Sequence, residues 1–299
     1  MKTEPSSHIL AFTEAAWQTA AGFEAAIIFS QTLGLRSMTV LPILFKGNLG
    51  KAEVAEIAKR HDMKLICCGF RAQAEISPYT PEGIQPAIED FQDQFLWQDY
   101  FNESGVGDRF VVGPIPDDWG ADKSKFSLSG LRNYCEALAG LGRSMGITIC
   151  AEIVNRHESG INDPQLCIPY IISDLNDPFL RLHADIVHLA SYLGMEHVIA
   201  FIMKYSRIID VLELGMPDRM PMNSVEGFKV IADELFALLG GPLAHVKVSL
   251  EPFDYDAVIK PFALEEVYGF RGKGTDTLEA DVQFLAEKGL LRDRAPVGA

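Results

Sequence analysis

Short apolar runs rich in β-branched residues alternate with longer amphipathic segments along almost the whole chain. This alternation predicts strands joined by helices, and it favours a parallel sheet with crossover helices. The predicted strands cover residues 8–14, 37–44, 64–70, 109–115, 147–154, 180–187, 207–214 and 245–253. The clearest predicted helices cover residues 51–61, 81–95, 128–146, 188–205 and 224–241. Eight strands in 299 residues leave about 37 residues per unit, which fits a closed barrel better than an open sheet.

The spacing of these segments is even, and no low-complexity linker or change of composition divides the chain. We therefore predict the α/β class, with a single (β/α)8 TIM-barrel domain over residues 1–299. Hydrophobic residues make up 48% of the chain and charged residues 22%, which is a globular balance and excludes wholesale disorder.

The charge of the chain limits its partners. It has 41 acidic and 26 basic side chains, for a formal net charge of −15. Such a surface repels phosphate backbones, so we expect no nucleic-acid partner. No apolar run reaches the roughly 18–20 residues that a membrane span needs, so we expect no membrane partner either.

The cysteines and the first residues favour a cytoplasmic protein. There are five cysteines, an odd number, and none forms a CxxC pair. Residues 1–8 lack the basic start and the apolar stretch of a signal peptide. A reduced, cytoplasmic protein is the expectation that follows.

Acidic residues lie near the ends of the last four predicted strands. They are Glu152, Asp185, Glu213 and Glu251, separated by 33, 28 and 38 residues, or about one strand–helix unit each. In a barrel of this kind the chemistry lies where strands end and the following loops begin. Four acids at one rim repel each other unless a cation or shared protons relieve the charge, and a hard divalent ion with oxygen ligands does so.

Each of these acids also has a simpler interpretation. An acid near a strand end often caps the next helix or forms a surface ion pair, and Glu213 is the most open to that interpretation. His183, on the same side of its strand as Asp185, is either a partner of a metal ligand or a packed interior histidine.

Two motifs resemble those of the D-tagatose 3-epimerase group of the xylose isomerase-like TIM barrels. The segment AEIVNRHES, residues 151–159, is similar to the fifth-strand motif of this group, and HADIVH, residues 183–188, is similar to its sixth-strand motif. The first implies a metal ligand at Glu152 and a substrate contact at Glu158. The second implies a metal ligand at Asp185 and a substrate contact at His188.

Two further segments extend the resemblance. LEPF, residues 250–253, resembles the eighth-strand motif and implies that Glu251 is a metal ligand. The CCGF segment, residues 67–70, resembles the third-strand turn and implies a substrate contact at Cys67 or its neighbour Cys68.

One segment departs from the group. Its seventh strand usually supplies a metal-binding histidine, with an arginine six residues later, whereas DVLELGMPDR, residues 210–219, contains no histidine. Counting six residues back from Arg219, which the resemblance places at the substrate, reaches Glu213 as a replacement ligand. A register shifted by one residue reaches Leu212, which cannot bind a metal and would leave a three-ligand or metal-free site.

The resemblance implies a metal-dependent sugar isomerase or epimerase, most simply a ketose 3-epimerase that works through an enediolate. Glu152 and Glu251 would be its acid and base. Its expected cofactor is a divalent ion, Mn²⁺, Mg²⁺ or Co²⁺, and its expected partners are a small sugar and further copies of the chain in a dimer or tetramer. The alternatives are a lyase similar to inosose dehydratase, an inactive sugar-binding barrel, and a DNA-repair endonuclease. The endonuclease would need a histidine-rich zinc site, whereas this chain has seven histidines in all.

Overall fold

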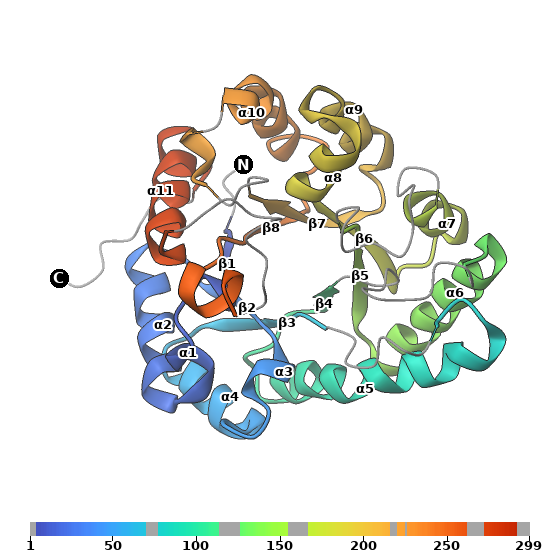
Figure 1. Cartoon of the computed structure of the whole chain (residues 1–299), viewed down its shortest axis with the longest axis horizontal. Coiled ribbons are helices and arrows are strands. Elements are labelled where there is room, and N and C mark those ends of the chain that lie inside the picture. The colour runs from blue at the N-terminus through green and yellow to red at the C-terminus, as the bar shows by residue number, and fades with distance from the viewer. Residues whose placement is uncertain are drawn as a thin grey trace.

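The structure is a computed structural model, and it describes residues 4–69, 77–113, 126–154, 167–215, 220–224, 226–261 and 272–291. Eight parallel strands form its centre, and helices surround them (Figure 1). The strands are β1 (Ser6–His8), β2 (Ser37–Val40), β3 (Lys64–Cys67), β4 (Phe110–Gly113), β5 (Thr148–Glu152), β6 (Leu180–Asp185), β7 (Ile209–Leu214) and β8 (Lys247–Leu250). The predicted (β/α)8 barrel is therefore confirmed.

The strand order runs from β3 through β2, β1, β8, β7, β6 and β5 to β4, so the first strand lies beside the last. Two isolated bridges, Leu65 to Gly107 and Cys68 to Val112, join β3 to the β4 region and nearly close the barrel. Gln98, which is fully buried, supports this join. Its side-chain oxygen accepts the N–H of Cys67 at 2.7 Å, and its side-chain nitrogen donates to the Asp108 carbonyl at 2.9 Å.

Helices follow most of the strands and cover the outside of the barrel. The described α-helices are α1 (Ala15–Gln18), α2 (Ala20–Thr32), α3 (Pro42–Phe45), α4 (Lys51–Arg60), α5 (Pro81–Glu103), α6 (Leu128–Met145), α7 (Ile168–Leu175), α8 (Ile186–Leu193), α9 (Met195–Tyr205), α10 (Glu226–Leu239) and α11 (Gly274–Glu287). Shorter turns are η1 (Ile9–Ala11), η3 (Met222–Ser224) and the π-helical η4 (Tyr255–Ile259). In α6, the buried residues Leu131, Cys135 and Leu138 recur at helical spacing and pack inward.

Several predicted boundaries were wrong, among them the end of the helix predicted over 81–95, which runs to Glu103, and three of the errors have a local cause. The first strand ends at His8, where the prediction began it, because the His8 ring accepts the N–H of Leu10 and the chain turns into η1. The second strand stops at Val40, and Pro42 starts α3. The helix predicted over 188–205 is two helices, which meet at Gly194 with a φ of 77°.

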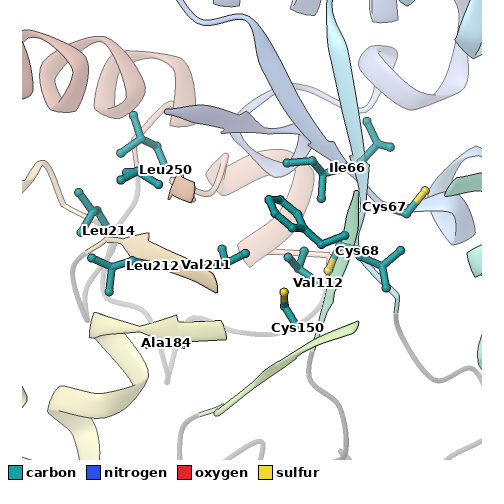
Figure 2. Packing of buried hydrophobic residues seen from close by; sticks show 14 of the residues in the cluster. Ile66, Cys67, Cys68, Val112, Cys150, Ala184, Val211, Leu212, Leu214 and Leu250 are labelled. Carbon is teal, nitrogen blue, oxygen red and sulfur yellow. The ribbon is translucent and has the colours of Figure 1, made fainter. Parts of the chain in front are cut away.

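Part of the barrel interior below its carboxyl end is apolar. Figure 2 shows Val112, Cys150 and Val211 around the same interior space, and all three are buried. Cys150 and Val211 precede Glu152 and Glu213 by two residues, so strand alternation places them one layer below these acids. The side chains directly below Glu152 and Glu213 therefore cannot solvate charge.

Within the part of the chain that the structure describes, no single helix has the length and apolar character of a membrane span. Helices α8 and α9 have that length and apolar character only when they are counted as one segment, and a bend of 116° separates them.

Candidate active site

The four predicted acids arrive at the same end of the barrel. Glu152 and Asp185 are the last residues of β5 and β6, Glu213 is the second-last residue of β7, and Glu251 directly follows β8. The strand register pairs Asp185 with Glu213 and pairs Glu152 with His183. Because all eight strands are parallel, their carboxyl ends meet there, where barrels of this kind carry their chemistry.

Ligand atoms of these residues approach one another in two groups that share Asp185. One group is Asp185, Glu213 and Glu251, and the other is Glu152, Asp185 and His188. Within each group the ligand atoms all lie within 4.8 Å of one another. Glu152, Asp185 and Glu213 are buried, and the Glu251 side chain is 12% exposed.

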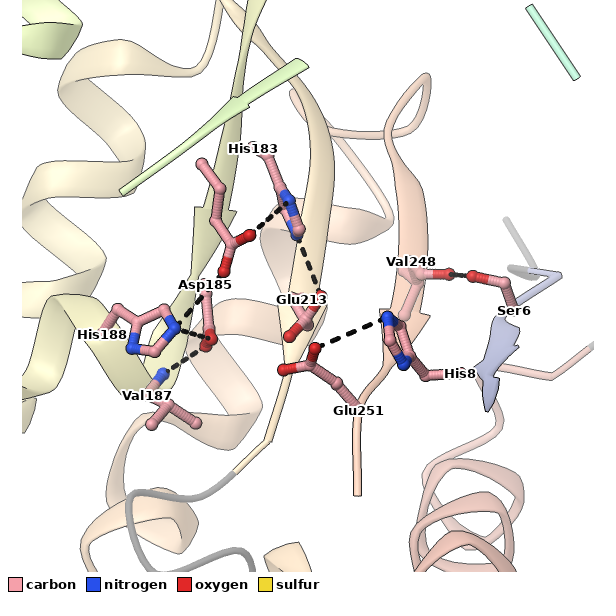
Figure 3. Close-up of polar contacts among 10 residues, drawn as sticks. Ser6, His8, His183, Asp185, Val187, His188, Glu213, Val248 and Glu251 are labelled. Carbon is pink, nitrogen blue, oxygen red and sulfur yellow. Dashed lines mark hydrogen bonds and ion pairs between the residues drawn. The ribbon is translucent and has the colours of Figure 1, made fainter. Parts of the chain in front are cut away.

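Three imidazoles lie beside the carboxylates (Figure 3). His188 Nε2 lies 3.1 Å from Asp185 Oδ2 and 3.3 Å from Glu152 Oε1. His183 stands between two acids, with Nε2 3.1 Å from Glu213 Oε2 and Nδ1 3.8 Å from Glu152 Oε2.

The third imidazole belongs to His8, which the sequence analysis did not identify. Its Nε2 atom lies 3.5 Å from Glu251 Oε1. The only signal in the sequence was that this histidine lies at the edge of the first apolar run, and the prediction placed it at the wrong end of that strand. Its position beside Glu251 depends on the pairing of β1 with β8.

Asp185 also caps a helix. Its Oδ1 atom accepts the N–H of Val187 at 2.6 Å, which starts α8 directly after β6. The capping interpretation of this acid therefore holds, and it is compatible with metal binding, since Oδ2 faces His188.

Burial makes negative charge costly at two of these positions. The pKa of Glu213 is raised well above its ordinary value, first by burial and then by the nearby charges of Glu251 and Asp185. Burial also raises the pKa of Glu152, although His183 and His188 oppose that shift. Burial lowers the pKa of His183, despite the attraction of the neighbouring acids. In the absence of a cation, burial therefore favours the neutral forms of Glu152, Glu213 and His183.

A divalent cation fits these residues. Among the described residues, Oε1 of Glu213 is buried and has no hydrogen-bond donor, which is a costly state for a carboxylate oxygen in an apolar surrounding. The donor set of carboxylate oxygens with one imidazole is one that Mn²⁺ or Mg²⁺ accepts, and a cation would remove the charge repulsion that raises the pKa of Glu213.

Cys67 and Cys68 lie in different electrostatic environments. Cys67 is fully buried, its backbone N–H donates to Gln98, and burial alone raises the pKa of its thiol. The pKa of Cys68 is raised by burial and also by the charges of Glu152 and Glu251. Of the two cysteines, Cys68 is therefore the one whose thiol is affected by the charges of the acids.

The remaining predicted substrate contacts, Glu158 and Arg219, lie outside the described residues, so their placement stays a prediction. Of the predicted site residues, the structure brings together Glu152, Asp185, His188, Glu213 and Glu251.

Comparison with solved structures finds the same fold in sugar epimerases. An L-ribulose 3-epimerase superposes with a TM-score of 0.77 and 15% identity, covering 98% of this chain and 99% of that one. A D-allulose 3-epimerase from Methylomonas sp., solved with D-allulose, superposes with a TM-score of 0.75 and 16% identity, covering 96% and 97%. An AP endonuclease of family 2 from Brucella melitensis gives a TM-score of 0.67 and 15% identity, covering 96% and 99%.

No family model matches the sequence, and no curated protein matches it. Identities of 15–16% show the fold alone, and that fold is the (β/α)8 barrel shared with the two sugar 3-epimerases and the AP endonuclease. The resemblance of the motifs is therefore confirmed at the level of the fold.

Proposed function

We propose that this protein is a divalent-metal-dependent sugar isomerase or epimerase, most simply a ketose 3-epimerase. The observation that carries the proposal is the convergence of Asp185, Glu213 and Glu251, with Glu152 and His188 beside them, at the carboxyl end of the barrel. Solved 3-epimerases share this fold over nearly the whole chain.

Asp185, Glu213 and Glu251 would hold the proposed ion, and Glu152 and His188 form with Asp185 a second group of candidate ligands. A bound divalent ion would polarise the sugar carbonyl and stabilise the negative oxygens that form when the neighbouring carbon loses its proton. Because a carboxylate has two oxygens, one can bind the ion while the other reaches the substrate.

Glu152 and Glu251 are the proposed acid and base. Epimerisation next to a carbonyl removes a proton from one face of the carbon and returns one to the other face, so it needs two proton-transferring groups on opposite sides. Glu152 comes from the end of β5 and Glu251 from the end of β8, and the two strands β7 and β6 lie between them in the sheet, so the two carboxylates would approach a bound sugar from different sides. Burial raises the pKa of Glu152 and so favours its protonated form, and we therefore assign it as the acid in the direction in which Glu251 is the base.

Two alternatives keep the same barrel. A lyase similar to inosose dehydratase would use the same carboxylates and ion but expel water, so its products would differ. An inactive sugar-binding barrel would bind sugar without turnover, and the absence of a histidine from residues 210–219 is its support. An endonuclease is disfavoured because the net charge of −15 opposes a nucleic-acid substrate. The cytoplasmic location and a homodimer or homotetramer remain predictions.

The test combines metal analysis with a product assay. The purified protein is stripped with chelator, reloaded with Mn²⁺, Mg²⁺ or Co²⁺, and incubated with a panel of free ketoses and with an inosose. Formation of the C3 epimer only in the reloaded samples supports the proposal. Dehydration of the inosose would favour the lyase, and sugar binding without any product would favour the inactive barrel.

A further inference from the structure

His8 occupies a rigid position at the join between the first and last strands. It is the last residue of β1, only 2% exposed, and β1 pairs with β8 through Ser6–Ser249 and Ser7–Leu250. Just beyond it, the carbonyl of Leu10 accepts the N–H of Asp254, three residues after Glu251. The segment that carries His8 is thus tied to the segment that carries Glu251.

The hydrogen bonding of the ring determines which of its nitrogens carries the proton. Nδ1 of His8 accepts the backbone N–H of Leu10 at 3.3 Å, so this nitrogen must be unprotonated. The proton of the ring is then on Nε2, the atom that lies 3.5 Å from Oε1 of Glu251. Figure 3 shows the ring turned toward this carboxylate. His8 is therefore a neutral donor toward Glu251 and keeps its bond to Leu10 only in this form.

Neither of the other two site histidines has this arrangement in the described part of the chain. No backbone N–H is bound by Nδ1 of His183, which lies 3.8 Å from Glu152. Nε2 of His188 lies between Asp185 and Glu152 and contacts both carboxylates. Of the three rings, the His8 ring has a backbone donor on one nitrogen and the Glu251 carboxylate facing the other.

We propose that His8 is a positioning residue for Glu251. Its Nε2–H interacts with Oε1 of Glu251 and so orients this carboxylate toward Asp185 and Glu213. A carboxylate oxygen of Glu251 lies within 4.8 Å of ligand atoms of both acids. Metal-binding carboxylates are commonly held by such partners, and loss of a partner typically weakens metal affinity by about 10–100-fold. The part of this inference that concerns catalysis rests on the proposed function, whereas the part that concerns cation binding does not.

The test compares two substitutions at His8 with the same pair at a control histidine. His8→Phe fills the space of the ring but removes the donor. His8→Gln places an amide N–H near the former Nε2 position and loses the acceptor for Leu10. His61 is the matched control, because its Nε2 lies 2.7 Å from Glu24 Oε1 in another imidazole–carboxylate pair, away from the barrel end. Mn²⁺ affinity is measured by calorimetry on each full-length, folded variant.

We expect His8→Phe to weaken Mn²⁺ binding by about 10-fold or more, His8→Gln to recover most of that loss, and both His61 variants to match the wild type. In an active preparation, His8→Phe should lower kcat more than it changes KM, with the same recovery in His8→Gln. Mn²⁺ affinity of His8→Phe within about twofold of the wild type would overturn the inference, and so would equal losses in His8→Phe and His8→Gln. Loss of sugar turnover in every protein, with the expected order of affinities, would count against the proposed function and leave the role of His8 standing.

The protonation of the ring provides a second measurement that requires neither metal nor turnover. In ¹⁵N-histidine spectra of the metal-free protein, the resonance lost in His8→Gln should report an unprotonated Nδ1 and a protonated Nε2. Observation of the opposite tautomer, or of a doubly protonated ring, would refute the assignment.

Discussion

His183 Nε2 on β6 lies 3.1 Å from Glu213 Oε2 on β7, and these side chains are only 2% and 3% exposed. In the group that the motifs resemble, the seventh strand usually supplies a metal-binding histidine, whereas this chain has Glu213 there. An imidazole nevertheless lies beside this carboxylate, carried by the neighbouring strand β6. Glu213 is therefore not a solvated loop acid, because it is buried beside His183 and in the same group as Asp185 and Glu251.

This pair predicts a coupled effect on stability. His183→Leu should lower the melting temperature of the metal-free protein at pH 7.5 by about 5 °C or more, because it leaves the buried polar side chain of Glu213 without its imidazole neighbour. Adding Glu213→Leu should recover much of the loss, since it removes that carboxylate. Thermal unfolding of the two single variants and the double variant measures the coupling. Additive losses would show that the two side chains act independently.

Glu213→His tests whether Glu213 is a metal ligand. If it is, the wild-type site is rich in oxygen and should favour Mn²⁺ or Mg²⁺, whereas the new nitrogen should shift preference toward Co²⁺ or Zn²⁺. Calorimetric titration of both proteins with Mn²⁺ and Co²⁺ makes the comparison. Identical profiles for wild type and variant would eliminate Glu213 as a ligand.

Glu152→Gln and Glu251→Gln test the assignment of acid and base. Each substitution keeps the shape of the side chain but cannot exchange a proton, so each should reduce turnover by more than tenfold while the fold is retained. Glu136→Gln, on the exposed surface of α6, is the control that should leave activity unchanged. Activity above a tenth of the wild-type value in either site variant would remove that residue from the mechanism.

Asp281 predicts a pH dependence of stability that is separate from the active site. This carboxyl on α11 is 2% exposed, it accepts the N–H of Met222 at 2.7 Å, and burial raises its pKa to about 8. The folded protein therefore holds a proton that the unfolded chain releases near pH 4, so the free energy of unfolding should fall as pH rises from about 4 to about 8.

Asp281→Asn keeps an oxygen acceptor for Met222 and removes the titrating group. The variant should be more stable than the wild type at pH 9, and this advantage should shrink by about 2 kcal/mol or more at pH 5. Denaturant unfolding at the two pH values measures both differences. A variant that is less stable than the wild type at pH 9 would show that the ionised carboxylate is stabilising in the folded state.

Much of the barrel could be predicted because its signals are local. A strand reveals itself through a few consecutive apolar residues, and a crossover helix through the spacing of one apolar face, so the eight units and their order follow from the chain directly. The errors lie where a side chain changes the local backbone, as at His8 and Gly194. A ring that accepts a nearby N–H, or a single glycine in an apolar helix pattern, changes the local structure without changing that pattern.

The acids of the candidate site could be predicted by the same means, since Glu152, Asp185, Glu213 and Glu251 each end a recognisable strand. The sequence by itself therefore determined the barrel and the carboxylates at its rim. Only the tertiary structure decided which imidazole faces which acid. His8 meets Glu251 across 243 positions of sequence, because the closed sheet places the first strand beside the last. His183 meets Glu213 because the register of two parallel strands, with a bulge between Leu182 and His183, brings the two side chains together. Such contacts depend on closure, register and burial, which are properties of the whole sheet and are not carried by any one of its segments.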